Sequence, residues 1–152
     1  MTLNELMLRH NFITKIVFKD GTNELSKELK VKIMKIRVAM GKIRKNFEDD
    51  LKEVAEGLIP EGYKELAQIK DKTPEQESTY KEQTDALNAA YQKYVVDEGT
   101  NEVTGNHIDD KFTEDEYFEI VGVNGSISVD INGTSISGPD FLDVIYSIFV
   151  EA

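Results

Sequence analysis

One apolar stripe between residues 24 and 58 constrains the fold of this 152-residue chain more than any other feature. Its members recur at steps of three and four residues: Leu29, Ile33, Ile36, Met40, Ile43, Phe47, Leu51, Val54 and Leu58, with Met34 beside them. An average spacing of about 3.6 residues is typical of an amphipathic helix. At about 1.5 Å per residue this helix would be about 50 Å long. A compact domain of this size cannot bury all of it, so a second long helix must pair with it.

The expected partner is a helix over residues 74–96. Thr73-Pro74-Glu75-Gln76 has the pattern of a capping box with proline at the first helical position. Pro60, after Gly57, ends the first long helix, so the two should pack antiparallel. This arrangement predicts one buried contact between the two stripes, made on one side by Ile36, Met40, Ile43 and Phe47 and on the other by Leu87, Tyr91 and Tyr94.

Shorter elements are predicted on either side of the long helices. A capping box at Thr2 and Glu5 opens a helix over about 3–17, with a break near Asn11 as the alternative, and a turn follows at 19–23. Residues 97–110 contain almost no apolar side chain and are expected to form an exposed loop. Thr113 then opens a short helix through a third capping box with Glu116.

The period changes from helical to alternating near residue 127. Asn132-Gly133 is typical of a type I′ turn and would pair Val129 with Ile136 on one face of a β-hairpin. A last helix follows from Gly138. We therefore expect a mostly α fold, α+β in strict terms: a short N-terminal helix, a long antiparallel helical hairpin, and a C-terminal β-hairpin plus helix. The expected division is a helical domain over 1–110 and a small subdomain over 111–152.

The predicted hairpin strands have few devices that protect a free edge. Asp130 is the single charged residue in the two strands, and the outward positions are serines. Such edges favour pairing with a strand of another chain. Val129 and Ile136 are therefore candidate interaction residues, with coverage by the last helix as the alternative.

Charge is distributed very unevenly along the chain. Residues 1–46 hold 11 Lys and Arg against 4 Asp and Glu, whereas residues 47–152 hold 7 against 25. Lys30, Arg37 and Arg44 recur every seven residues on one helix and form a basic ridge. This ridge could contact an acidic surface of the same chain or of a neighbour. Phosphate contact is the weaker alternative, because no aromatic side chain is interleaved with the ridge and the chain as a whole is acidic.

The sequence favours a protein that is not an enzyme and that has no cofactor or metal. It contains no Cys, only two His, and no glycine-rich phosphate loop. His10 is expected to lie at the boundary of its helix. His107, Asp109 and Asp110, near the acidic residues Asp97, Glu98 and Glu102, could bind a divalent cation through oxygen. Their spacing fits no EF-hand, which favours an ordinary solvated acidic loop.

No apolar run approaches the ~18 residues of a membrane span, and the N-terminus lacks the pattern of a signal peptide. We therefore expect a soluble chain in a reducing compartment, with no membrane partner.

The order of these parts resembles a family of small proteins encoded among the virion genes of tailed bacteriophages. The resemblance lies in "NELSKELKVKIMKIRVAMGKIRKNFEDDLKEVAEGL", the capped second helix, and "ISVDINGTSISGPDFLDVIYSIFVEA". It implies a structural or assembly role, location in a virion assembled in the host cytoplasm, and other virion proteins as partners.

Three hypotheses for the function follow. The first is an oligomeric head–tail connector or neck component, and the second is a free cytoplasmic adaptor that binds a partner through the helical hairpin. The third, with the least support, is a nucleic-acid-binding module that uses the basic ridge.

Overall fold

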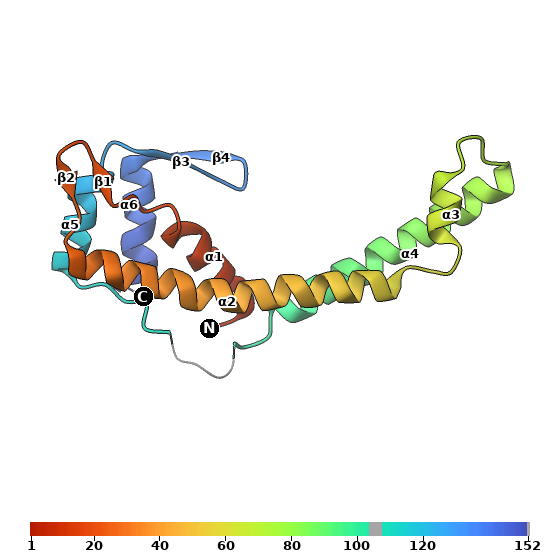
Figure 1. Ribbon diagram of the computed structural model, residues 1–152, viewed down its shortest axis with the longest axis horizontal. Coiled ribbons are helices and arrows are strands. Elements are labelled where there is room, and N and C mark those ends of the chain that lie inside the picture. Colours follow the sequence, from red (N-terminus) through yellow and green to blue (C-terminus); the bar gives the residue numbers. More distant parts are fainter. Residues whose placement is uncertain (104–107, 152) are drawn as a thin grey trace.

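The computed structural model describes residues 1–103 and 108–151, which form a head and a projecting stalk (Figure 1). The head combines helices α1, α5 and α6, two small hairpins and the first half of α2, and the stalk comprises the rest of α2 with α3 and α4. The elements are α1 (Leu3–Ile13), β1 (Lys19–Asp20), β2 (Asn23–Glu24), α2 (Lys27–Leu58), α3 (Tyr63–Gln68), α4 (Pro74–Gly99), α5 (Glu114–Asn124), β3 (Ser128–Ile131), β4 (Thr134–Ser137) and α6 (Gly138–Tyr146), followed by a π-helical turn (Ser147–Glu151). The expected mostly α fold with a C-terminal β-hairpin and helix is confirmed.

All three capping boxes that the sequence predicts are present in the structure. In the first, the amide of Thr2 donates to the Glu5 carboxylate at 2.7 Å, and the amide of Glu5 donates to the Thr2 hydroxyl at 3.2 Å. The boxes that open α4 and α5 have the same reciprocal bonds. Such caps satisfy amides that the first helical turn leaves without partners, and each contributes about 1 kcal/mol.

Helix α2 is buried only along its first half. Leu29, Ile33, Ile36 and Met40 are its buried side chains, and they belong to the core of the head. The helix begins after Ser26, whose hydroxyl accepts from the Leu29 amide. It ends at Leu58, where Ile59 is extended, as the residue before a proline prefers.

One hydrophobic cluster forms the core of the head. Most of its buried members come from α1, α2, α5, α6 and the π-helical turn, and they include Leu6, Ile13, Ile33, Ile120, Phe141, Ile145 and Phe149. Phe12 of α1 stacks on Phe141 of α6, with ring centroids 6.1 Å apart. Residues from both sequence segments expected as separate domains, 1–110 and 111–152, therefore share this cluster.

Helix α1 ends at Ile13, four residues earlier than expected, because its continuation is held by side chains instead of a helical ladder. Arg37 donates to the carbonyls of Ile13 and Ile16. Asn124 is fully buried and bonds both backbone groups of Val17, accepting at 2.8 Å and donating at 3.1 Å. The chain then enters the β1–β2 hairpin, where a turn alone was expected.

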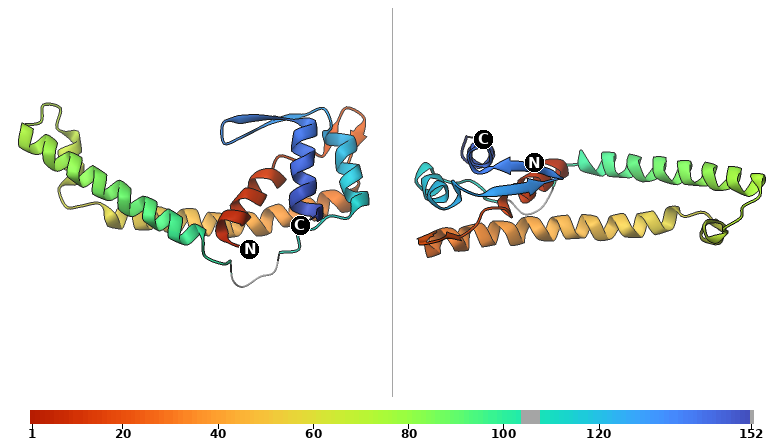
Figure 2. Two further views of the ribbon diagram at one scale, coloured as in Figure 1. Left: turned by 180° about the vertical axis from the view of Figure 1, so that it is seen from behind. Right: turned by 90° about the horizontal axis from the view of Figure 1, so that it is seen from above.

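In the stalk, α4 runs antiparallel to α2, and α3 lies at the far end (Figure 2). Tyr63 of α3 stacks on Tyr80 of α4 with centroids 5.4 Å apart, and its hydroxyl contacts that of Thr84 at 2.9 Å. The helix predicted over 74–96 continues to Gly99.

The predicted contact between the two long stripes is only partly right. Ile36 and Met40 are buried in the core cluster of the head, where α1 packs on α2. Phe47 and its counterparts on α4 (Leu87, Tyr91 and Tyr94) remain partly exposed. Two helices alone cannot enclose a seam, because water reaches it from both sides.

The β3–β4 hairpin has the predicted register. Val129 pairs with Ile136 and Ile131 with Thr134. The turn residues Asn132 and Gly133 have φ values of 52° and 79°, as a type I′ turn requires. Figure 1 shows the hairpin projecting from the top of α6 and passing above α1.

Candidate interaction surfaces

A second apolar stripe of α2 faces away from the core of the head. Val31, Met34 and Val38 follow at steps of three and four residues, so they share one side of the helix. Their exposed fractions are 41, 53 and 57%. With Lys35, Ala39 and Lys42 they line a shallow groove of about 420 Å³. We call this surface the outer α2 face.

The outer α2 face combines apolar and cationic character. None of the described side chains that line the groove is acidic, and two are lysines. Neither Lys35 nor Lys42 forms an ion pair within residues 1–103 and 108–151. A binding partner for this surface would therefore combine an apolar side chain with negative charge.

The basic ridge of Lys30, Arg37 and Arg44 is occupied within the chain. Lys30 pairs with Glu24, and Arg37 binds carbonyls after α1 while its guanidinium lies 4.8 Å from the centre of the Phe18 ring. Burial of Arg37 lowers the pKa of its guanidinium. Lys30 and Arg37 thus have partners in other segments of the head.

Arg44 joins α2 to the last turn of α1. It donates to the Asn11 amide oxygen at 2.6 Å, lies 3.3 Å from Nδ1 of His10, and pairs with Glu48 at 3.0 Å. Burial, and then the positive charge of Arg44, lower the pKa of His10. His10 therefore lies in the last turn of α1, at the contact between α1 and α2.

The two candidate residues of the β-hairpin are half-buried. Val129 and Ile136 face each other across the ladder and pack against the core cluster. The serines on the other face, Ser128 and Ser135, are exposed and lie 3.2 Å apart through their hydroxyls. Within the described residues the sheet has two strands, so each strand has an outer edge.

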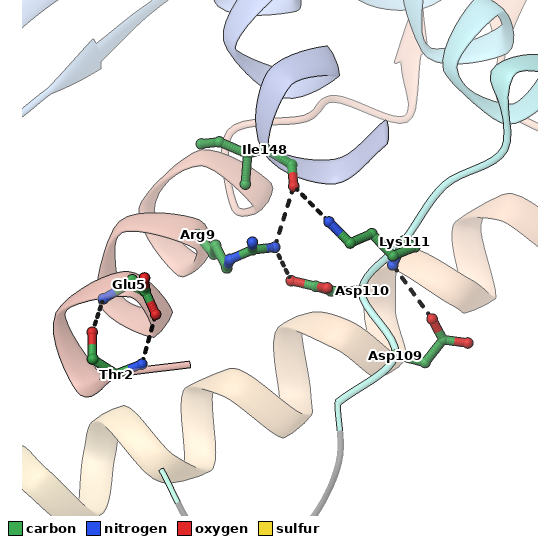
Figure 3. Close-up of polar contacts among 7 residues, drawn as sticks. All are labelled: Thr2, Glu5, Arg9, Asp109, Asp110, Lys111 and Ile148. Atoms are coloured by element: carbon green, nitrogen blue, oxygen red, sulfur yellow. Dashed lines mark hydrogen bonds and ion pairs between the residues drawn. The ribbon is translucent and has the colours of Figure 1, made fainter. Parts of the chain in front are cut away.

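In the described part of the acidic segment 97–110, Asp110 differs from the exposed loop that was expected. Asp110 is 4% exposed and accepts a hydrogen bond from Arg9 of α1 at 2.6 Å (Figure 3). Arg9 also donates to the Ile148 carbonyl at 3.3 Å, and Lys111 donates to the same oxygen at 3.2 Å. The sequence did not indicate this pairing, because the two partners lie 101 residues apart.

A cation site in this segment receives no support from the geometry. His107 lies outside the described residues. The Asp109 carboxylate accepts from the Lys111 amide at 3.4 Å, whereas Asp110 pairs with Arg9. Among residues 1–103 and 108–151, no three His, Asp or Glu side chains are grouped as metal ligands. The cavity of about 270 Å³ next to Asp110 is lined also by Arg9 and Lys111, which disfavours a cation.

The seam of the stalk has two shallow grooves. One, of about 290 Å³, is lined by Ala55, Ile59, Leu87 and Tyr91, and the other shares Tyr91 and Ala55. These grooves are apolar openings between α2 and α4 that a further helix could cover.

Sequence reasoning missed the outer α2 face. Val31 and Val38 lie between the lysines of the basic segment, where the stronger inner stripe dominates the pattern. Their spacing of seven residues, with Met34 between them, was the available signal. It also missed Phe118, which is 63% exposed on α5 and lies within an acidic run.

Comparison of the sequence with protein-family models and with curated proteins, and of the structure with solved structures, finds no match. Within the described part of the chain, no helix has the length and apolarity needed to cross a bilayer.

Proposed function

We propose that this chain is a non-enzymatic structural protein that acts as one subunit of an oligomer. The outer α2 face is the observation that carries this proposal. Monomeric proteins seldom expose three large apolar side chains in one contiguous row, and such rows are typical of surfaces that bind other proteins. Val31, Met34 and Val38 form such a row on the first half of α2, the part of the helix whose opposite side is buried in the head.

The proposed setting is a tailed-phage particle, with the oligomer at the head–tail connector or neck and other virion proteins as neighbours. The resemblance of the sequence to virion-region proteins supports this setting. The elongated shape supports it as well, because the stalk extends far from the head and could reach a neighbouring subunit (Figure 2).

The proposal is tested by the mass of the purified protein in solution. Light scattering after size-exclusion chromatography should give a mass well above the 17.2 kDa of one chain. Met34→Asp should reduce that mass toward 17.2 kDa, because a charge would be buried at the contact. Val96→Asp, at a similarly exposed position on α4, is the matched control and should leave the oligomer intact.

The phage setting has its own test. Mass spectrometry of purified particles should detect this chain at a fixed copy number. If the protein is absent from particles but oligomeric in solution, the phage setting is wrong, whereas the proposed structural role still stands. If the wild-type protein is monomeric at every concentration, the proposal that it acts as a subunit of an oligomer is wrong.

An adaptor that binds a partner helix is the second candidate, and the grooves along the stalk seam favour it. In that case the isolated protein is a stable monomer, and Tyr91→Asp, not Met34→Asp, abolishes partner binding. Nucleic-acid binding has less support, because Lys30, Arg37 and Arg44 already have partners within the chain.

A further inference from the structure

Helix α5 carries one strongly exposed aromatic side chain. Phe118 is 63% exposed, the largest value among the exposed large apolar residues of the described chain. Glu114 and Asp115 precede it by four and three residues, and Gly122 follows by four, so these residues share one side of α5. All of them are exposed. We call this surface the acidic α5 face.

The acidic α5 face has the chemistry that the outer α2 face lacks. It offers a large apolar side chain beside two carboxylates, whereas the outer α2 face offers an apolar groove beside Lys35 and Lys42. A groove of about 420 Å³ is large enough to receive one aromatic ring. The two surfaces therefore both offer apolar side chains and are opposite in charge.

Gly122 leaves this side of α5 open to close approach by another chain. Glycine weakens a helix interior more than any residue except proline. Within the described residues, a methyl group added at Gly122 would meet no atom within 4 Å, and the residue does not have a positive φ. The head therefore gives no packing or backbone reason for glycine here. A glycine at this position would permit the close approach of a second chain to this side of α5.

We propose that the acidic α5 face of one copy docks on the outer α2 face of a second copy. Phe118 enters the groove between Val31 and Val38, and the carboxylates of α5 meet Lys35 and Lys42. This inference rests on the proposed role as an oligomeric subunit and names the contact that builds the oligomer.

The contact joins two different surfaces, so it is heterologous. Phe118 and Val38 are both exposed in one chain, which shows that a copy does not cover its own groove. In Figure 2, α5 lies at the end of the head whereas α2 runs along its side. The pair then keeps one unused acidic α5 face and one unused outer α2 face, on different copies, and repetition of the contact gives a ring if the rotation closes.

The test uses two full-length variants that each destroy one surface. Phe118→Asp removes the apolar side chain of α5, and Val38→Asp places a negative charge in the groove. Each variant alone should be monomeric by light scattering, with association at least tenfold weaker than that of the wild type. An equimolar mixture should form a dimer, because each variant retains the surface that the other lacks. Unchanged circular dichroism confirms that both variants fold, and Val96→Asp is the exposed control.

The Gly122→Ala variant distinguishes a contact at α5 from a role of Gly122 in folding alone. It should raise Tm, because alanine favours the helix, and it should weaken association by crowding the contact. A salt titration should weaken association in the wild type as the lysine–carboxylate pairs are screened.

Three outcomes would overturn the inference. Phe118→Asp that still assembles shows that α5 is not in the contact, and Val38→Asp that still assembles excludes the groove. A mixture that remains monomeric excludes the heterologous pairing. In all three cases an assembling wild type leaves the proposed oligomeric role intact, whereas a wild type that never assembles overturns both.

Discussion

At the scale of residues, two polar side chains replace a missing backbone ladder in the segment after α1. Arg37 donates to the carbonyls of Ile13 and Ile16, and Asn124 bonds the amide and the carbonyl of Val17. Nearly all buried backbone groups in proteins have partners, and here side chains supply them. Arg37 belongs to the basic ridge, whose pattern in the sequence suggests a binding surface. In the structure its guanidinium has a clear role in the fold instead.

Asn124→Ala should destabilise the head. The substitution leaves two backbone groups of Val17 without their partner, and each orphaned group costs about 1–3 kcal/mol. In a domain of this size each kcal/mol lowers Tm by about 2–4 °C. Differential scanning calorimetry measures the change. Asn46→Ala, at an exposed position of α2, serves as the control, and equal Tm values for the two variants would contradict the role given to Asn124.

At the scale of elements, the β3–β4 hairpin has the register that the sequence predicts, and within the described residues its sheet has two strands. The register makes Val129–Ile136 and Ile131–Thr134 the hydrogen-bonded pairs of a two-residue hairpin. The amides of Asp130 and Ser135 therefore point away from the ladder. An incoming strand could use them, so we expect residues 126–137 to pair with another chain in the assembled state.

Ser135→Pro should remove the protein from particles without changing its oligomeric state in isolation. Proline deletes one outward amide but keeps the inner ladder bonds. Ser135→Ala keeps the amide and should be incorporated normally. Mass spectrometry of particles measures incorporation. Val129→Asp and Ile136→Asp are poorer tests, because both side chains pack on the core and charge there would damage the head. Normal incorporation of the proline variant would exclude an edge contact through this amide.

Elements built from local signals could be predicted from the sequence, whereas contacts between distant segments could not. The capping boxes at Thr2, Thr73 and Thr113 and the turn at Asn132 depend on four or fewer neighbouring residues, and all formed. The burial of Asp110 depends on Arg9, which lies 101 residues away. The outer α2 face could not be predicted for the same reason, because the side of α2 that faces the core depends on where α1 and α6 pack.

At the scale of the whole molecule, the head and the stalk differ in how completely they exclude water. The core cluster lies in the head, whereas in the described stalk the apolar seam residues are only partly buried. Burial of apolar area is the main source of stability, so the stalk helices should open more readily than the head.

Native-state hydrogen exchange should reveal this difference within one helix. Amides of α2 near Ile33 and Met40 should exchange through global unfolding, and those near Leu51 and Val54 through local opening at lower free energy. The measurement is mass spectrometry of peptides from each half of α2. Uniform protection along α2 would contradict this prediction, or would show that association covers the stalk as well. Repeating the experiment with the monomeric Val38→Asp variant distinguishes these two cases.

The way the stalk is attached to the head allows the length of the stalk to vary independently of the head. The head is closed by the segment after α4, where the Val103 amide donates to the Met1 carbonyl and the Met1 amino group pairs with Glu102 at 3.0 Å. For the head, the stalk is thus an insertion whose two ends lie together. Doubling the length of a flexible loop costs only about 0.6 kcal/mol in closure entropy. Adding seven residues to each long helix would extend the stalk by about 10 Å and keep the seam in phase. Evolution can therefore change the reach of this molecule without altering the packing of its core.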